Sequence, residues 1–452
     1  MKAGFQLDLN RCTGCEACVL ACTVENRLGW GTSWRRVGTF NAARHPAAPV
    51  FHLSLACNHC VEPPCADACP ALAYSRDART GLVRFDARRC IGCRYCTWAC
   101  PYDAPRYDSA AGVVAKCTSC DDRLAEGLAP ACVVACPTRA LTHGPSEELD
   151  GVRNVPGFPR TNAQPSIRFV ALREDRAQPV LAAGSVEPFP VEAITPAPVA
   201  RRSRIGMRRE WPLAVFTLAA AVLVAWWTAA ATAAVTVRAA PFAVLAVASV
   251  SLAGFHLGRA ARAWRAVFNL RRSWLSREIF LFGAFVCLAI VASIRAEFAG
   301  GIPIAVVGFA ALFAIDRVYD VVRPPGEFPL HSSDATITGL FLSGILQANG
   351  LLAGTVGAVK LALYAGRRVG PTRSCRRTGP ATVAARCLLG FALPALAWFA
   401  APERWELWAA AAALAGEFVD RTEFYEELAI VTPDATIASD LRAVVAASRA
   451  AG

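Results

Sequence analysis

Histidine is scarce in this sequence, and cysteine is almost absent from its second half. Of the six histidines, only His256 and His331 lie beyond residue 143, and they are not spaced to bracket a haem between membrane helices. We therefore expect no b-type haem. Only three of the 19 cysteines lie beyond residue 140, namely Cys287, Cys375 and Cys387. We expect these three to be small packing residues rather than metal ligands.

The N-terminus lacks the features of an export signal. The opening residues, MKAGFQLDLNRC, contain neither an apolar core nor a twin-arginine pair. We expect that this chain does not carry its own secretion signal. That expectation leaves the cellular location open, because a partner subunit can carry a signal for both.

The two halves of the chain differ in composition and charge. Residues 1–150 carry 16 Lys and Arg against 15 Asp and Glu, a net charge of +1, whereas residues 201–452 carry 26 against 16, a net charge of +10. All the long apolar runs lie after residue 210, so the basic excess belongs to loops that flank membrane spans. No aromatic-basic surface motif supports nucleic-acid binding.

Sixteen cysteines form four groups in the first 140 residues. The groups are Cys12, Cys15, Cys18 and Cys22; Cys57, Cys60, Cys65 and Cys69; Cys90, Cys93, Cys96 and Cys100; and Cys117, Cys120, Cys132 and Cys136. The first and third groups have the spacing of the bacterial ferredoxin run, in which three thiolates bind one cubane and the fourth binds its neighbour. The sequence therefore predicts four [4Fe–4S] clusters bound by these sixteen thiolates.

Zinc and disulfides are the alternatives for so many cysteines. Zinc ribbons use two separate Cys-x-x-Cys pairs, not triplets followed by a fourth cysteine. Disulfide scaffolds are usually small secreted domains. Both alternatives fit this pattern less well than iron–sulfur clusters do.

Local signals around the cysteines indicate small strands and sharp turns. Pro70, Pro101 and Pro137 follow the last cysteine of groups two to four and turn the chain, whereas the chain after Cys22 continues as TVENR in a predicted helix. The stretches FQLDLN, SWRRVGTFN, FHLSLACN and LVRFD alternate as short strands do, and SIRFVAL predicts an edge strand that completes the domain. We expect their aromatic residues to form core.

Composition predicts four regions in the chain. These are an iron–sulfur domain over 1–185, a proline-rich and basic linker over 186–210, a membrane anchor over 211–422 and a polar tail over 423–452. The arginines of RRSRIGMRRE, directly before the first apolar run, are expected to lie at lipid headgroups. The fold class is therefore an α+β double ferredoxin-like domain followed by an all-α polytopic transmembrane bundle.

Eight apolar runs predict the spans of this bundle. They lie at about 211–235, 239–258, 278–298, 302–322, 335–349, 351–367, 384–401 and 405–420. The fifth and sixth are nearly continuous around Asn349 and Gly350. We expect a tight hairpin there, giving eight spans; one long tilted helix, giving seven, is the alternative.

Loop arginines predict the orientation. With eight spans, 18 arginines lie on the side of the iron–sulfur domain and 3 on the other side. By the positive-inside rule, we expect the anchor to lie in a bacterial inner membrane with the iron–sulfur domain on its cytoplasmic side. The periplasmic alternative stays open, because loops that dock onto a cluster domain can be basic for that reason alone.

The order and spacing of the four cysteine groups resemble the four-cluster electron-transfer subunit of the dimethyl sulfoxide reductase family of molybdenum enzymes. KCTSCDDRLAEGLAPACVVACPTRAL and CNHCVEPPC carry the resemblance. The resemblance implies an exchange of ligands between groups. The implied sets are Cys12, Cys15, Cys18 and Cys136; Cys117, Cys120, Cys132 and Cys22; Cys57, Cys60, Cys65 and Cys100; and Cys90, Cys93, Cys96 and Cys69.

The stretch HLGRAARAWRAVFNLRRSWLSREIF, from His256 to Phe280, resembles the membrane anchor subunit of the same family. The chain thus looks like the two subunits fused into one. The resemblance implies that His256 and Glu278 bind quinone, since a histidine titrates in the range needed to pass a quinone proton. The alternatives are a helix-end histidine bonded to a carbonyl, and an ion pair of Glu278 with Arg277 or Arg272.

The expected function is electron transfer in anaerobic respiration, between membrane quinone and a separate molybdopterin-containing catalytic subunit, through four [4Fe–4S] clusters. Both the dimethyl sulfoxide reductase type and the sulfite dehydrogenase type fit, so the direction stays open. The chain has no recognisable pterin site, so the catalytic centre lies elsewhere. The alternatives are an electron-transfer module for a polysulfide reductase or hydrogenase, or a non-redox, metal-stabilised membrane scaffold.

Overall fold

The computed structural model describes residues 2–29, 32–40, 50–173, 205–295, 301–322, 330–369, 379–400 and 405–428, with 430, 432 and 433. The chain divides into two compact units. Residues 1–202 and 431–452 belong to the first unit, and residues 203–430 to the second. Most of the predicted linker, and of the predicted tail, lies outside the described residues.

The first unit is built on a three-stranded sheet. Its order is β8 (Leu141–Pro145), β1 (Ala3–Asp8) and β9 (Ile167–Val170). Strand β1 pairs antiparallel with β8 and parallel with β9, so β9 is an edge strand, as its sequence predicts. This pairing brings the start of the domain against its last two strands.

Three two-stranded ribbons are the other strands in the described part of this unit. They are β2 (Arg36–Phe40) with β3 (Phe51–Leu55), β4 (Tyr74–Arg76) with β5 (Val83–Phe85), and β6 (Arg106–Asp108) with β7 (Val113–Ala115). The alternating pattern predicts β1, β2, β3, β5 and β9. It misses β4, β6, β7 and β8, three of which have only three residues and are too short to show a period.

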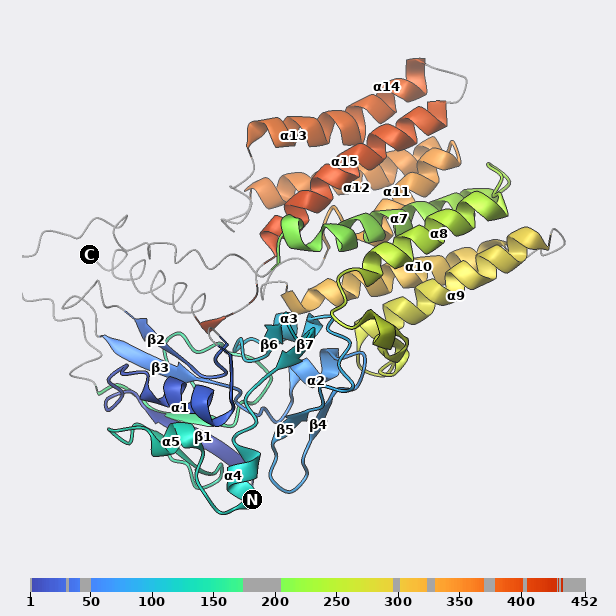
Figure 1. Cartoon of the computed structure of the whole chain (residues 1–452). Coiled ribbons are helices and arrows are strands. Elements are labelled where there is room, and N and C mark those ends of the chain that lie inside the picture. The colour runs from blue at the N-terminus through green and yellow to red at the C-terminus, as the bar shows by residue number, and fades with distance from the viewer. Residues whose placement is uncertain are drawn as a thin grey trace, which may run out of the picture. The chain divides into compact units, whose positions relative to one another are not determined.

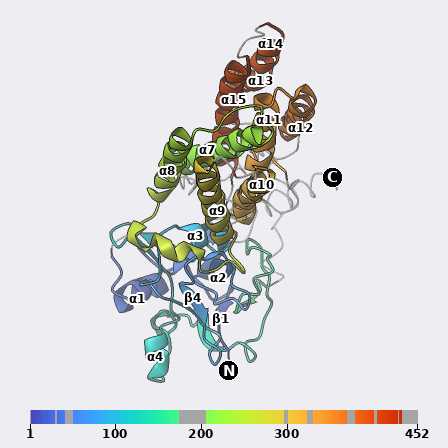
Figure 2. The same cartoon turned by 90° about the vertical axis from the view of Figure 1, so that its right-hand side faces the viewer.

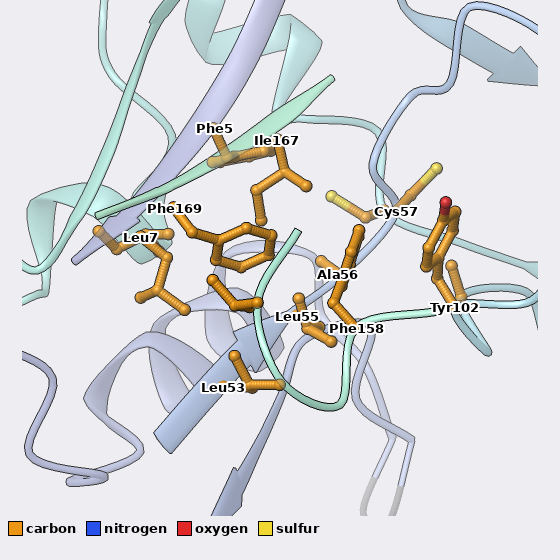
Figure 3. Close-up of a cluster of buried hydrophobic side chains, with 14 of the residues drawn as sticks. Phe5, Leu7, Leu53, Leu55, Ala56, Cys57, Tyr102, Phe158, Ile167 and Phe169 are labelled. Carbon is orange, nitrogen blue, oxygen red and sulfur yellow. The ribbon is translucent and has the colours of Figure 1, made fainter. Parts of the chain in front are cut away.

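Aromatic and aliphatic side chains from distant segments form the core of the first unit (Figure 3). The ring of Phe158 stacks on Tyr102 and meets Phe169 edge-on, with both centroid distances at 4.9 Å. Phe5 and Leu7 of β1 project into the same core. Burying each such side chain contributes roughly 1.5–3 kcal/mol, which ties the cysteine loops to the sheet.

Five short helices follow the cysteine loops. They are α1 (Ala17–Glu25), α2 (Pro64–Ala68), α3 (Tyr95–Ala99), α4 (Asp121–Ala125) and α5 (Ala131–Val134). Helix α1 carries Cys18 and Cys22 and ends at Glu25, so the predicted helical continuation after Cys22 is present. Helices α2 and α3 end before the prolines that follow Cys69 and Cys100.

The described part of the second unit is helical (Figures 1 and 2). Its elements are α7 (Met207–Ala231), α8 (Ala239–Gly254), η3 (Ala260–Val267), α9 (Trp274–Ile294), α10 (Gly301–Val318), η4 (Tyr319–Val322), α11 (Ala335–Leu346), α12 (Gly350–Val369), α13 (Pro380–Cys387), the π-helical turn η6 (Leu388–Ala392), α14 (Leu393–Ala400) and α15 (Trp405–Glu427). Each predicted apolar run coincides with a helix or, for the seventh, with the continuous segment α13–η6–α14.

Four of these helical segments are long and apolar enough to cross a membrane. They are Met207–Ala231, Trp274–Ile294, Gly301–Val322 and Pro380–Ala400. About 20 apolar residues suffice to cross the hydrocarbon of a bilayer. The chain therefore has a membrane-spanning region, while the count of eight spans stays a prediction.

Helices α11 and α12 form a hairpin and not one long helix. The break is at Ala348, whose φ of 51° is left-handed, and the N–H of Asn349 donates to the carbonyl of Gly344 at 2.9 Å. Gly344 also allows the close approach of the two helices, since a Cβ there would lie 2.7 Å from the nitrogen of Ala353. The hairpin is the arrangement that the sequence favours.

The helices at both ends of the second unit extend beyond the predicted anchor. Helix α7 begins at Met207, inside the predicted linker, and α15 continues to Glu427, inside the predicted tail. The last turns of α15 read as polar in the sequence. They stay helical and packed because Asp420, Glu423 and Glu427 pair with basic side chains of α12.

Candidate functional site

Each of the four cysteine loops has a left-handed backbone conformation at its third position. Gly14 and Gly92, at the third position of the first and third groups, have φ values of 72° and 74°. His59 and Ser119 hold the same position in the other two groups, and their φ values are 43° and 64°. Residues with a Cβ rarely adopt this region, so the tight left-handed turn is a requirement of the loop.

This turn directs backbone N–H groups at sulfur. The N–H of Gly92 donates to Sγ of Cys90, and the N–H of Ser119 donates to Sγ of Cys117, both at 3.3 Å. Ala73 does the same to Cys69 at 3.4 Å. Hydrogen bonds to sulfur stabilise the thiolate over the thiol, which a metal ligand requires.

Two cavities are each lined by four cysteines. One is lined by Cys57, Cys60, Cys65 and Cys100, and the other by Cys12, Cys15, Cys18 and Cys136. In both, the fourth cysteine comes from a different group. These are the combinations that the family resemblance implies, although whether the thiols bind a cluster stays a prediction.

The remaining eight cysteines approach one another in the same way. Cys22 interacts electrostatically with Cys120 and Cys132 of the fourth group. Cys69 does so with Cys90, Cys93 and Cys96. All sixteen cysteines thus fall into four sets, each containing one cysteine from a different group.

Electrostatic interactions between cysteines of different sets indicate the order of the sets. Cys18 of the first set interacts with Cys132 of the second, and Cys117 of the second with Cys57 of the third. Cys65 of the third set interacts with Cys96 of the fourth. The row therefore begins at Cys12 and its partners and ends at Cys90 and its partners.

The donor set fits an iron–sulfur cluster. Among the described residues, no three His, Cys, Asp or Glu side chains converge closely enough for a single metal ion. A cubane holds its four thiolates farther apart, at its corners.

Burial raises the pKa of the Cys22 thiol to about 11 and, together with Cys57, that of Cys117 to about 12. Such thiols become thiolates when a metal binds them.

Arg35 is a buried cation between the first two sets. Only 1% of its surface is exposed, and its Nη1 donates to the carbonyl and the hydroxyl of Ser54 at 3.2 and 3.1 Å. The same hydroxyl lies 3.3 Å from Sγ of Cys18. Burial alone would lower the pKa of Arg35, but the neighbouring cysteines, Cys132 first among them, raise it. The sequence does not reveal this residue, because the adjacent Arg36 has the same side chain and pairs with Asp103.

His256 lies just after α8, half-buried. Its Nδ1 donates to the carbonyl of Ala253, which is the carbonyl-bonded helix-end histidine that the sequence leaves open as an alternative. This hydrogen bond fixes the tautomer in which Nε2 carries the lone pair.

Glu278 lies buried in the first turns of α9. Within the described residues it makes no ion pair: Arg277 instead donates to the carbonyls of Leu270 and Arg271 and covers the ring of Trp274. The charged groups that act on Glu278 are Arg421 and Asp316. The structure therefore places Glu278 in a buried polar region, without bringing it into a described contact with His256.

Buried charges of α12, α13 and α15 are a feature that sequence reasoning misses. Lys360, Arg386, Glu417 and Asp420 are all at most 1% exposed. A charge inside a membrane helix is costly unless it is paired, and such residues are usually functional. Their presence in apolar runs is the signal that could have found them.

Comparisons with known proteins concern the cysteine-rich part. The family described as 4Fe-4S dicluster domain matches residues 49–146. One chain of the anaerobic dimethyl sulfoxide reductase of Escherichia coli (strain K12) is 44% identical over 154 residues, which cover 32% of this chain and 75% of the relative. One subunit of the sulfite dehydrogenase of Allochromatium vinosum is 35% identical over 199 residues, covering 38% and 83%. One subunit of the tetrathionate reductase of Salmonella typhimurium is 41% identical over 133 residues, covering 29% and 52%.

Proposed function

Because this chain belongs to the iron–sulfur subunits of the dimethyl sulfoxide reductase and sulfite dehydrogenase type, we propose that it carries electrons between a membrane quinone and a separate catalytic subunit. Membership of this family makes the chain an oxidoreductase subunit with [4Fe–4S] clusters. The observation that carries the finer proposal is the arrangement of sixteen cysteines in four sets that follow one another in a row.

Four clusters are bound in this proposal, one by each set. The ligands are Cys12, Cys15, Cys18 and Cys136; Cys22, Cys117, Cys120 and Cys132; Cys57, Cys60, Cys65 and Cys100; and Cys69, Cys90, Cys93 and Cys96. A bound cluster supplies reversible transfer of single electrons. The protein holds the thiolates, donates N–H groups to sulfur and keeps water away through the core around Phe158.

The row of sets defines the electron path. Thiols of neighbouring sets interact electrostatically, as Cys117 does with Cys57, and we infer that electrons pass between the clusters in that order. The path works in both directions, so the chain can serve either a reductase or a dehydrogenase. The names of the relatives include both kinds.

The helical unit acts as the membrane anchor and quinone site. We infer that the helical segments at the eight predicted apolar runs all cross a bacterial inner membrane. The iron–sulfur unit and the C-terminus would then lie on the cytoplasmic side. Oxidation of a quinol releases two electrons and two protons. His256 would accept a hydrogen bond from the quinol through Nε2, and Glu278 would take up a proton. A C-terminal tag accessible only from the periplasm would contradict the orientation.

The catalytic partner is a molybdopterin-containing subunit. Support comes from the relatives, each of which is named as one component of a reductase or dehydrogenase. The polysulfide reductase or hydrogenase type of partner has no observation in its favour. Co-purification with the catalytic subunit from native membranes, followed by molybdenum analysis, tests this part of the proposal.

The test of the quinone role uses His256→Phe in the full chain. Reduced methyl viologen gives electrons to the clusters directly, whereas a short-chain quinol must use the quinone site. We expect the variant to keep about 16 iron atoms per chain and its cluster spectra. We expect viologen still to reduce its clusters, and quinol to do so far more slowly than in the parent. Loss of the clusters, or unchanged reduction by quinol, contradicts the role of His256.

A further inference from the structure

Lysine is rare in this chain, and two of the lysines are buried. Of the 47 lysine and arginine residues, only Lys2, Lys116 and Lys360 are lysines. Lys2 is exposed, whereas Lys116 of the first unit is 3% exposed and Lys360 of the second unit is fully buried. An ammonium is a compact point charge on a flexible stem, unlike the planar guanidinium of arginine. A buried lysine in so arginine-rich a chain indicates a site that a compact charge fits.

Lys116 lies between strand β7 and the fourth cysteine group. It follows Ala115, the last residue of β7, and precedes Cys117. Its Nζ donates to the carbonyl of Cys117 at 3.0 Å and to the carbonyl of Val83 in β5. These two bonds hold the ammonium between a cysteine loop and a strand from a much earlier part of the chain.

The same side chain borders the cavity of the third set. Lys116 and Val83 line this cavity together with the four cysteines of the set, which are Cys57, Cys60, Cys65 and Cys100. The neighbour of Lys116 in sequence, Cys117, belongs instead to the second set. Lys116 thus connects the backbone of one cysteine loop to the thiol cavity of the next set in the row.

His59 helps to fix the strand that Lys116 binds. It lies in the loop of the second cysteine group, and its Nδ1 accepts from the N–H of Val83 at 3.1 Å. The hydroxyl of Ser166 donates to the carbonyl of His59 at 3.0 Å. An imidazole nitrogen that accepts an N–H carries no proton itself, so His59 is neutral here. Lys116 is therefore the charged member of this group of hydrogen-bonded residues.

The ammonium of Lys116 has no carboxylate partner in the described part of the chain. Its hydrogen bonds go to two backbone carbonyls, and no described aspartate or glutamate pairs with it. An ammonium has three N–H donors, so one donor of Nζ has no described acceptor. A buried charge is costly unless an opposite charge compensates it. The cavity that Lys116 borders is thus suited to a negatively charged group.

A cluster bound by four thiolates is such a group. It carries net negative charge, and its reduction adds one more electron. A cation beside it stabilises the reduced form more than the oxidised form, because the Coulomb energy grows with the charge of the cluster. A fixed positive charge at this cavity therefore raises the reduction potential of whatever cluster the cavity holds.

We propose that Lys116 is the counter-charge of the cluster bound by the third set and that it raises the reduction potential of this cluster. The inference rests on the proposed function, because it requires a cluster in this cavity. Lys116 is a positioning charge and not a ligand. The step that it influences is the transfer of one electron to or from the cluster, in which no bond is formed or broken.

Lys116 and Arg35 serve different sets in this proposal. They are the two buried lysine and arginine side chains among the described residues of the first unit. Arg35 donates to Ser54, whose hydroxyl lies 3.3 Å from Sγ of Cys18 in the first set. Lys116 borders the third cavity and bonds the backbone of the second set. Its effect should be largest on the third cluster and smaller on the second, since the Coulomb energy falls with distance.

The charge of Lys116 gives the row a direction. A higher potential at the third cluster makes electron transfer from the fourth cluster to the third more favourable, and the return step less favourable. Electrons that enter the row at the fourth set are therefore drawn toward the third. Removing the charge should slow passage in this direction, whereas the clusters themselves should stay bound.

A purely structural role for Lys116 makes a different prediction. Its two hydrogen bonds tie β5 to the fourth cysteine group, and this tie would show in stability and iron content rather than in a potential. Lys116→Gln separates the two roles, because glutamine keeps an N–H donor and removes the charge. Lys116→Arg keeps the charge and changes the shape.

The test is an EPR-monitored redox titration of the full chain. The signal of the third cluster is identified first, as the one that Cys60→Ser shifts or removes. In Lys116→Gln we expect the ratio of reduced to oxidised third cluster at a fixed potential to fall about tenfold, a shift of about 59 mV to lower potential for one electron. The potential in Lys116→Arg should stay close to that of the parent. Lys2→Gln is the matched control, because it removes an exposed lysine, and should change no potential.

The outcomes separate this inference from the function on which it rests. The parent's potential in Lys116→Gln, or an equal shift in Lys116→Gln and Lys116→Arg, overturns the role of the charge. Loss of the third signal from Lys116→Gln alone supports a counter-charge, whereas loss from both variants shows a structural role and contradicts it. A parent chain that binds no iron–sulfur cluster overturns the proposed function itself, and the role of Lys116 fails with it.

Discussion

Lys360 and Glu417 form an ion pair from which solvent is entirely excluded. Their side-chain atoms Nζ and Oε2 are 3.0 Å apart, and neither side chain has any exposed surface. Nζ also donates to the hydroxyl of Thr338 at 3.0 Å, while Glu417 accepts from Arg386. An ammonium and a carboxylate at such a position stabilise the bundle only as long as both are present.

Replacing Lys360 alone should therefore destabilise the helical unit. Lys360→Met leaves Glu417 with one of its two described cations, Arg386, and breaking a buried pair costs about 3–5 kcal/mol. The double variant Lys360→Met with Glu417→Gln removes both charges and should recover much of this loss. The thermal midpoint of the purified protein in detergent measures both. A double variant as unstable as the single one contradicts the pairing.

Two glycines control how closely α15 approaches the π-helical turn η6. A Cβ on Gly416 would overlap the backbone of Gly390 and lie 3.0 Å from Nη1 of Arg386. We expect Gly416→Ala to cost roughly 1–3 kcal/mol, because backbone has to move. Gly354→Ala in α12 is the control, since its Cβ meets nothing within 4 Å. It should leave the thermal midpoint unchanged or raise it, so equal losses in both variants would argue against the close approach.

The charge of Arg35 should raise the reduction potentials of the clusters proposed beside it. A cation stabilises the reduced, more negative cluster. At an effective dielectric constant of about 20 and a separation of about 8 Å, one charge contributes about 2 kcal/mol, or roughly 90 mV for one electron. Arg35→Leu should lower one or two potentials by this order in an EPR-monitored redox titration, and Arg35→Lys should lower them less.

Arg153→Leu is the control for Arg35, because it removes the same charge at an exposed position. Its four potentials should equal those of the parent. We therefore expect the charge of Arg35 to change the reduction potentials of the clusters and not the number of clusters bound. If Arg35→Leu leaves all four potentials in place, the cation does not tune them.

Much of the first unit follows from the sequence for a physical reason. Three ligands of a cluster come from one compact loop, so the sequence spacing of Cys12, Cys15 and Cys18 is enough to predict the site. From Phe5 to Asp8, strand β1 alternates between buried and half-buried residues, and alternation is a signal that short windows preserve. Strands such as β6 lack it, because three residues held by one hairpin need no period.

The second unit shows what a sequence pattern does not contain. In the described part of this unit, apolar runs predict each helix except η3, yet composition says nothing about which charges meet. Glu417 and Asp420 become partners of Arg386 only through the packing of α13 against α15. The sequence assigns the polar end of α15 to the tail, because the ion pairs that hold it also depend on helix packing. His331 looks like an ordinary loop residue until its hydrogen bonds with Ser333 and Glu427 are seen.

The exchange of ligands between groups has a test in Cys22. Cys22→Ser should disturb the cluster proposed for Cys117, Cys120 and Cys132, while Cys15→Ser should disturb the cluster proposed for Cys12, Cys18 and Cys136. Serine is a poorer ligand than thiolate, so we expect a shifted or lost EPR signal in each variant. Two variants that damage the same signal would show that Cys22 serves its own group.

Acid should weaken the first unit through His143. Burial and, to a lesser degree, Arg35 lower the pKa of this histidine to about 4, and its Nε2 lies 3.2 Å from the hydroxyl of Ser119. In the unfolded chain a histidine has a pKa of about 6.5. Below that pH the unfolded state binds a proton that the folded state excludes until the pH reaches about 4. The stability that this histidine contributes is therefore complete above a pH of about 6.5 and is lost as the pH falls between these two values.

The size of this effect is measurable. Between a pH of about 7 and a pH of about 5 the excluded proton should remove roughly 2 kcal/mol from the free energy of unfolding. Denaturant titrations of the full chain at both pH values, followed by cluster absorbance, give this difference. His143→Gln stays neutral and should lose that much less on acidification, whereas His52→Gln, at a half-buried position, should change little. An equal acid response in the parent and in His143→Gln would mean that other groups cause it.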